Sequence, residues 1–183
     1  CAAPGGKSSQ LAAALQGQGL LVSNEYVAAR ADILKSNLER MGVPNAVILN
    51  EAPARIAEAL PEFFDRVLVD APCSGEGMFR KEPVARQQHC EALVKQCAEL
   101  GAQILDCAAA ALAPGGQLVY STCTLSRAEN DEVADRFLAE HPDFEPAPLG
   151  EAFGSDSGLC RMSITPAKYN SDGFFIAKFI RLR

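Results

Sequence analysis

Residues 66–77 read RVLVDAPCSGEG, an apolar run that ends in an acid and leads directly into a turn rich in proline and glycine. Residues 116–124, GQLVYSTCT, form a second apolar run, which leads into hydroxyl residues and a cysteine. A short apolar run bounded by turn residues is typical of a strand buried inside a parallel sheet. Each segment therefore predicts a buried strand that places a cysteine, Cys73 or Cys123, just beyond its carboxyl end.

Helical patterns alternate with runs of this kind along most of the chain. We predict four buried parallel strands, over residues 20–24, 46–50, 67–70 and 117–121. We predict helices over residues 6–15, 26–41, 55–60, 91–112 and 126–138, the last opened by a capping box at Ser126 and Glu129. This alternation predicts an α/β fold, an open and mostly parallel sheet with helices on both faces.

The C-terminal part of the sequence has a different pattern. Residues 144–158 are rich in proline and glycine and predict a loop. Two apolar runs follow, GLCRMSI at 158–164 and GFFIAKFIRL at 173–182. With little sequence between them, they predict an antiparallel pair of strands at the sheet edge.

Length and composition narrow the class of protein. The 183 residues suffice for one ordinary domain with a sizeable core, and no apolar run approaches the roughly 20 residues that span a bilayer. The seven cysteines form no CxxC pair and the two histidines lie in no ligand cluster. We therefore expect free thiols, no metal, no membrane, a reducing cytoplasmic setting and a monomer. Cys90, Cys97 and Cys107 are expected to be structural, since they lie in a helical stretch.

The formal net charge of −6 argues against a generic nucleic-acid binder, because such proteins carry a basic surplus. If the substrate is a nucleic acid, a local basic patch or a further domain must attract it. The segment GMFRK at 77–81 offers an apolar pair followed by two cations. Such a pair suits a base to pack on and a phosphate to bind, although charged loop residues are usually only solvated.

The first seven residues, CAAPGGK, combine small side chains with paired glycines ahead of a predicted helix. Such a loop lets the backbone approach a ligand closely, and the helix offers its N-terminal N–H groups. The segment does not match GxxxxGK[ST], so a phosphate-binding P-loop is not expected. The chain begins at Cys1 rather than Met, and no strand precedes the loop. Since the first strand is central in a doubly wound fold, we expect a fragment whose first strand is encoded upstream.

Three acids, Glu25, Glu51 and Asp70, stand at the ends of three successive predicted strands. Glu25 follows the glycine loop by roughly 20 residues, the separation at which an acid accepts hydrogen bonds from ribose hydroxyls in nucleotide sites. Ligands of open α/β sheets bind along this edge. The acids therefore predict a site for a cofactor that contains a nucleoside; the alternative is solvated loop carboxylates.

The loop cysteines suggest chemistry at the same edge. A thiol has a pKa near 8.5 and is a strong nucleophile once ionised. If the strands before Cys73 and Cys123 are neighbours, both loops meet at one cleft. One thiol could then attack an electrophilic carbon while the other assists a later proton transfer. The alternative is two loop thiols that do not act together.

Together, these motifs resemble those of the RNA cytosine-5 methyltransferases of the Sun/Nop type, and most of all the bacterial enzymes that modify 16S ribosomal RNA. The matching segments are CAAPGGK at 1–7, NE at 24–25, DAPCSGEGMFRK at 70–81 and STCT at 121–124, in this order. The resemblance implies a Rossmann-like class I methyltransferase fold with its catalytic domain over residues 1–183. It also implies an RNA-binding segment upstream.

The resemblance implies a binding site for S-adenosylmethionine. Glu25 would accept hydrogen bonds from the ribose of this cofactor. Glu51, or Asn50 one residue earlier, would lie near its adenine, and Asp70 near its methionine part. The remaining contacts would come from the opening loop, that is from Cys1, Ala2, Ala3, Pro4, Gly5, Gly6 and Lys7.

The resemblance also implies a mechanism. Cys123 would add to C6 of a cytosine so that C5 can take the methyl group, Asp70 would stabilise the adduct at N3, and Cys73 would help to release the product. The target base must leave its stack to reach the thiol. The RNA substrate would be bound by Phe79, Arg80 and Lys81.

Two other functions compete with this one. In DNA cytosine-5 methyltransferases, which use similar chemistry, the nucleophile follows a proline in the loop that carries Cys73 here. Trapping with 5-fluorocytosine distinguishes the two by identifying the cysteine that reacts. The second rival is a module that binds S-adenosylmethionine and RNA without catalysis, which the presence of both cysteines disfavours.

Overall fold

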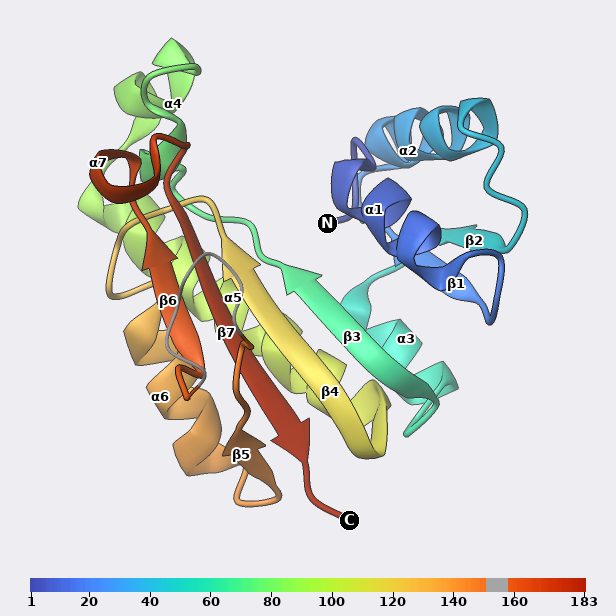
Figure 1. The fold of residues 1–183 in the computed structure, drawn as a ribbon. Helices are drawn as coiled ribbons and strands as arrows, with labels where there is room; N and C mark the ends of the chain where they lie inside the picture. The colour runs from blue at the N-terminus through green and yellow to red at the C-terminus, as the bar shows by residue number, and fades with distance from the viewer. Residues whose placement is uncertain (151–157) are drawn as a thin grey trace. The chain divides into compact units, whose positions relative to one another are not determined.

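The computed structural model describes residues 1–150 and 158–183 and contains two compact units, Cys1–Ile56 and Ala57–Arg183 (Figure 1). In both units strands alternate with helices, so the predicted α/β fold class is confirmed. Within the described ranges, no helix is both long and apolar enough to cross a membrane.

The first unit is built on two parallel strands, β1 and β2. Its elements are α1 (Gly6–Leu15), β1 (Leu21–Asn24), α2 (Ala28–Arg40) and β2 (Ala46–Leu49), followed by α3 (Pro53–Ala59), which spans the boundary between the units. α2 buries Ala31, Leu34 and Leu38, a spacing of three and four residues that places them on one face of the helix. The bounds of these five elements agree with the predicted ones to within two residues.

The second unit contains a five-stranded sheet in the order β3-β4-β7-β5, with β6 also paired to β7. Its elements are β3 (Phe64–Asp70), the 3₁₀ turn η1 (Glu76–Met78), α4 (Pro83–Gln88), α5 (Glu91–Ala111), β4 (Leu112–Thr122), α6 (Asp131–Glu140), β5 (Phe144–Pro146), β6 (Arg161–Ile164), α7 (Pro166–Tyr169) and β7 (Phe174–Arg181). β3 and β4 are parallel neighbours, and β5, β6 and β4 all pair with β7 antiparallel. This confirms the predicted change from parallel to antiparallel pairing toward the C-terminus.

The structure differs from the predicted sheet in three respects. The four predicted parallel strands lie in two sheets, β1 with β2 and β3 with β4, and no described strand connects β1 to β3. β7 lies inside its sheet rather than at the edge, because β4 covers one side and the short strands β5 and β6 pair with the other. Within the predicted loop over 144–158, the first residues form β5, and residues 151–157 lie outside the described part.

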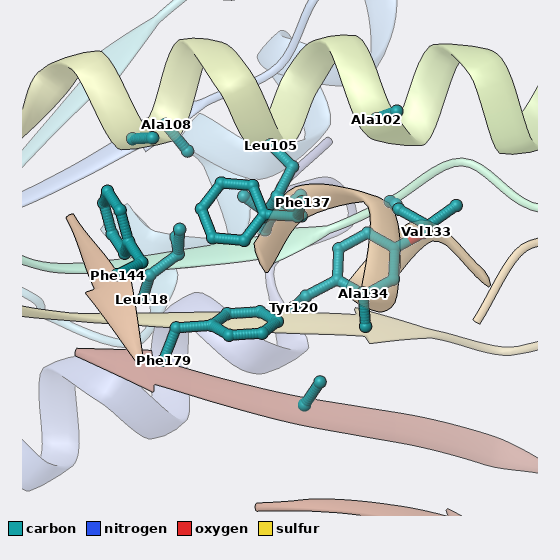
Figure 2. Close-up of a cluster of buried hydrophobic side chains, with 14 of the residues drawn as sticks. Ala102, Leu105, Ala108, Leu118, Tyr120, Val133, Ala134, Phe137, Phe144 and Phe179 are labelled. Atoms are coloured by element: carbon teal, nitrogen blue, oxygen red, sulfur yellow. The ribbon is translucent and has the colours of Figure 1, made fainter. Parts of the chain in front are cut away.

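The core of the second unit lies between its sheet and the helices α5 and α6 (Figures 1 and 2). Figure 2 shows Leu105 of α5 and Phe137 of α6 directed toward Leu118 of β4 and Phe179 of β7. All four side chains are at most 2% exposed. This packing fixes the strands whose carboxyl ends bear Cys73 and Cys123.

Tyr120 of β4 joins this core to the loops beyond it. The residue is 1% exposed, and its hydroxyl donates a hydrogen bond of 2.7 Å to the carbonyl oxygen of Glu129. Gly101 of α5 makes room for it, since a Cβ at position 101 would lie 2.8 Å from the Tyr120 hydroxyl oxygen. A glycine in mid-helix costs about 1 kcal/mol relative to alanine, and this contact explains its presence.

The predicted capping box at Ser126 and Glu129 is wrong. α6 begins at Asp131, and no side chain caps it at Asn130. The Glu129 carboxylate instead accepts two hydrogen bonds from Ser74, in the loop that follows β3. The local pattern was misleading because a partner distant in sequence takes the side chain that the capping box requires.

Candidate active site

A buried carboxylate holds the opening loop of the first unit against the end of β1. Glu25 is 1% exposed. Its Oε2 accepts a hydrogen bond of 3.3 Å from the Ala3 N–H, and its Oε1 accepts one of 3.1 Å from the Val27 N–H. Arg30 Nη1 also lies 3.6 Å from Oε1, so that oxygen has two partners and Oε2 has the Ala3 N–H. Since a carboxylate oxygen can accept more than one hydrogen bond, Oε2 could also accept one from a ligand hydroxyl.

Two residues of α2 hold the carbonyl groups of the same loop, and the motifs did not reveal them. Arg30 Nη2 donates 2.9 Å to the Ala3 carbonyl, and Asn37 Nδ2 donates 2.8 Å to the Pro4 carbonyl. The two side chains are seven residues apart and so share a face of the helix. That spacing was the one available signal, because their partners lie 27 and 33 residues away in the sequence.

The glycines at the end of the loop differ in what they provide. Gly5 has a φ of +114°, which side chains rarely adopt, and a Cβ there would lie 3.0 Å from Leu34 Cδ1. At Gly6, by contrast, an added Cβ would meet no described atom within 4 Å, and no side chain caps α1. Open space, an uncapped helix start and the buried acid Glu25 fit a nucleoside cofactor with a polar tail.

The two candidates for the adenine contact, Asn50 and Glu51, have different hydrogen-bond partners at the end of β2. The Asn50 amide donates to the carbonyl oxygens of Glu25 and Tyr26 at 2.7 and 2.8 Å, so its donors serve the backbone. Asn24 binds both the N–H and the carbonyl group of Glu51, whose carboxylate is 42% exposed and lies 3.5 Å from Arg55 Nη1. The Asn50 amide is thus engaged by the backbone, whereas the Glu51 carboxylate is partly open to solvent.

Cys73 and Cys123 lie together in the second unit, because β3 and β4 are neighbours, which is the condition on which the predicted contact depends. Their Sγ atoms are 3.1 Å apart, with 50 residues between them in the sequence. The Cys123 N–H also donates a hydrogen bond of 3.3 Å to Cys73 Sγ. Asp70, at the end of β3, accepts a hydrogen bond of 3.0 Å from the Ser121 hydroxyl at the end of β4.

The surroundings of the Cys73 thiol favour its protonated form. The pKa of the Cys73 thiol is raised well above its ordinary value, first by its hydrogen bond to Cys123 and second by burial. The Cys123 N–H acts in the opposite direction, with a smaller effect. Cys73 therefore keeps its proton at neutral pH, and its S–H can donate to Cys123 Sγ and stabilise negative charge there.

The loop that carries Cys73 is held to two other loops at Gly77. The Gly77 N–H donates 3.0 Å to the Cys123 carbonyl, and the Gly173 N–H donates 3.3 Å to the Gly77 carbonyl. A Cβ on Gly77 would lie 2.1 Å from the Gly173 oxygen, so no larger residue fits there. The sequence did not single out either glycine as a contact point.

The expected RNA-binding residues are in part already engaged. Lys81 Nζ forms a 2.6 Å ion pair with Asp172, and the Phe79 ring packs edge-on against His89 with centroids 5.4 Å apart. Arg80 is exposed, as is Arg86 on α4. Within the described part of the chain, no cluster of three or more His, Cys, Asp or Glu residues could hold a metal ion.

The comparisons with known proteins agree with this geometry. Residues 1–180 match the family model described as 16S rRNA methyltransferase RsmB/F. The chain belongs to this family. The family is one of S-adenosylmethionine-dependent RNA methyltransferases, so the resemblance predicted from the motifs is confirmed.

Individual relatives support the same assignment. The chain is 42% identical over 182 residues to ribosomal RNA small subunit methyltransferase F of Serratia proteamaculans, covering 97% of this chain and 38% of that protein. It therefore spans about two fifths of the length of such curated relatives.

Two solved structures from Pyrococcus horikoshii share the fold. A methyltransferase homolog protein is 33% identical with a TM-score of 0.81, covering 99% of this chain and 59% of that one. NSun6, determined with SFG, is 26% identical with a TM-score of 0.84, covering 100% of this chain and 47% of that one. The predicted class I methyltransferase fold is thereby confirmed.

Proposed function

We propose that this protein transfers a methyl group from S-adenosylmethionine to C5 of a cytosine in RNA, with small-subunit ribosomal RNA as substrate. The observation that carries the proposal is the Cys73–Cys123 pair, two thiols 3.1 Å apart at the ends of adjacent parallel strands. The family supplies the reaction class and the substrate class. The pair supplies the reason for cytosine C5, a carbon that becomes nucleophilic only after a thiolate adds to its neighbour.

The cofactor would be held by the opening loop of the first unit, with Glu25 at its ribose and Glu51 near its adenine. When bound, it supplies an electrophilic methyl group on a sulfonium sulfur. The residues Cys1, Ala2, Ala3, Pro4, Gly5, Gly6 and Lys7 would surround its remaining part. Arg30 and Asn37 would keep the loop in shape through the Ala3 and Pro4 carbonyls.

Cys123 acts on the base in this proposal. Its thiolate forms a bond to C6, and the electrons of the C5–C6 double bond become available for a bond from C5 to the methyl carbon. The bond from that carbon to the cofactor sulfur would break at the same time, with its electron pair left on the sulfur. A base then removes the C5 proton, the double bond re-forms, and the Cys123 sulfur leaves as thiolate. The S–H of Cys73 supports the sulfur charge at this last step, when the Cys123 thiolate leaves, which suits its raised pKa.

Asp70 completes the catalytic set. Its Oδ1 accepts a hydrogen bond from the Ser121 hydroxyl, which orients the carboxyl group. We assign Asp70 to N3 of the cytosine, where a proton shared between N3 and the carboxylate would stabilise the adduct. Arg80 and Lys81 would bind backbone phosphates and Phe79 would pack on a base, with Lys81 exchanging Asp172 for phosphate.

The remaining expectations stay part of the proposal. They are a cytoplasmic location, a monomer and a catalytic domain over residues 1–183.

The deciding experiment uses RNA that contains 5-fluorocytidine. Fluorine at C5 cannot leave as the proton does, so the adduct formed after methyl transfer persists. The full-length protein should form a covalent RNA complex on a denaturing gel, and Cys123→Ser should not. If Cys73→Ser abolishes the complex and Cys123→Ser does not, the DNA-type arrangement with Cys73 as nucleophile holds instead.

A further inference from the structure

We propose that Glu129 and Asn130, neighbours in the sequence, are positioning residues that serve the two cysteines separately. Glu129 positions the loop of Cys73, and Asn130 positions the loop of Cys123. Each therefore controls a different step of the reaction. The inference rests on the proposed function, because it takes from it the different tasks of the two thiols.

Glu129 binds the residue that follows Cys73. The side chain is 1% exposed. Its Oε2 accepts a hydrogen bond of 2.7 Å from the Ser74 N–H, and its Oε1 accepts one of 2.6 Å from the Ser74 hydroxyl. Both distances are short, as is usual when the acceptor is charged. One carboxylate thus fixes both the backbone and the side chain of the residue next to Cys73.

Asn130 binds the residues on both sides of Cys123. It is also 1% exposed. Its Oδ1 accepts a hydrogen bond of 2.6 Å from the Thr122 hydroxyl, and its Nδ2 donates one of 3.0 Å to the Thr124 carbonyl. The amide therefore spans Cys123, and it needs both an acceptor and a donor to do so.

The two clamps meet at one hydrogen bond. Ser74 Oγ lies 3.0 Å from Thr124 Oγ1. A hydroxyl has a single proton, and that of Ser74 is donated to Glu129, so Thr124 must be the donor to Ser74. The link is neutral and weaker than the bonds to the carboxylate. Each clamp can therefore be altered while the other keeps its own contacts.

Substitutions of matched shape separate the clamps. Glu129→Gln leaves one acceptor oxygen facing two donors of Ser74, so it disturbs the Cys73 loop. Asn130→Asp replaces the donor at the Thr124 carbonyl with an oxygen, so it disturbs the Cys123 loop. Since Cys73 is assigned to release and Cys123 to attack, the two variants should slow different steps.

The test measures both steps in the full-length protein with radiolabelled S-adenosylmethionine and RNA. Glu129→Gln should keep the single-turnover methylation rate within about threefold of the wild-type rate, lose about tenfold in steady-state turnover and accumulate a covalent RNA band. Asn130→Asp should lose about tenfold or more in the single-turnover rate and show no band. Glu132→Gln, the same change at an exposed position of α6, should match the wild type in both steps.

Two milder variants keep the test decisive if either protein misfolds. Ser74→Ala should behave as Glu129→Gln does, and Thr122→Val as Asn130→Asp does. The division of roles is overturned if the variants of the Cys73 loop and those of the Cys123 loop slow the same step equally. It is also overturned if none of these variants slows either step. The proposed function fails separately, and the inference with it, if Cys123→Ala still methylates RNA.

Discussion

Gly77 and Gly173 approach each other so closely that the Gly173 N–H donates a hydrogen bond of 3.3 Å to the Gly77 carbonyl with no space for a side chain between them. Gly77 also donates a hydrogen bond to the Cys123 carbonyl. It therefore connects the loop that precedes β7 with the loop that follows β4. The shape of the thiol site thus depends on two residues that have no side chain.

Gly77→Ala should therefore disturb both stability and activity. Its Cβ would lie 2.1 Å from the Gly173 oxygen, so one loop must move. Overpacking of this kind costs about 1–3 kcal/mol, and urea unfolding should detect a loss in this range together with reduced methylation. Gly158→Ala is the control, because an added Cβ there meets no described atom within 4 Å. Wild-type stability and activity in Gly77→Ala would contradict the role given to this contact.

Glu25→Gln should weaken cofactor binding. The amide group would place a donor against either the Ala3 N–H or the Val27 N–H, and it would offer the ribose a poorer acceptor. Hydrogen bonds to charged groups contribute about 1.5–3 kcal/mol, so calorimetry should record roughly a tenfold or greater loss of affinity for S-adenosylmethionine. Glu39→Gln, at an exposed position of α2, should bind normally. Unchanged affinity in Glu25→Gln would remove Glu25 from the site.

Cys123→Ala should abolish methylation while leaving the affinity for S-adenosylmethionine unchanged. The thiol acts on the base in the proposed mechanism, and the loop assigned to the cofactor belongs to the other unit. Calorimetry and a methyl-transfer assay on the same preparation test both parts. A variant that methylates RNA, or that loses cofactor affinity alone, would refute the assignment.

The reactivity of Cys73 should depend on Cys123. Its pKa is raised, so the fraction of thiolate at a given pH is lower than for an ordinary cysteine and alkylation is slow. In Cys123→Ala the largest cause of the shift is lost and burial remains, so the pKa should fall but stay above its ordinary value. Mass spectrometry of the Cys73 peptide after iodoacetamide treatment across pH 7–10 should show faster alkylation in Cys123→Ala than in the wild type. Equal rates of alkylation would mean that the thiols are not coupled.

Arg80→Ala should weaken RNA binding without affecting the cofactor. The side chain is exposed, whereas the nearby Lys81 is paired with Asp172. Loss of one phosphate contact reduces the slope of log affinity against log salt by about 1. A filter-binding titration at several salt concentrations provides the slope. Lys35→Ala, on α2, is the control, and an unchanged slope for Arg80→Ala would exclude it from the RNA interface.

The parts of the structure that could be predicted depend on local sequence. Apolar runs and turn residues predict β1, β2 and the ends of β3 and β4. The contact between Cys73 and Cys123 follows only once the pairing of β3 with β4 is known. The motif residues of the opening loop were identified for the same reason, since they are contiguous.

The parts that could not be predicted depend on partners distant in sequence. Glu129 fitted a capping box three residues after Ser126, but its partner Ser74 lies 55 residues away. Arg30, Asn37 and Asn130 are polar residues of ordinary appearance, and their roles follow from carbonyl or hydroxyl groups that only the folded chain brings near.

Gly101, in the core, is connected to the thiol site through Tyr120. This glycine leaves space for the Tyr120 hydroxyl, and that hydroxyl holds the backbone of Glu129. A methyl group added at position 101 of α5 would therefore displace the Tyr120 ring, and through it the backbone of Glu129 near the thiols. Among related sequences, position 101 should therefore vary together with position 120 rather than with its neighbours on the helix. Where a residue smaller than tyrosine stands at position 120, alanine should be tolerated at position 101. Gly101→Ala should therefore not stabilise the protein, although glycine has a low helix propensity and is an obvious residue to replace in α5.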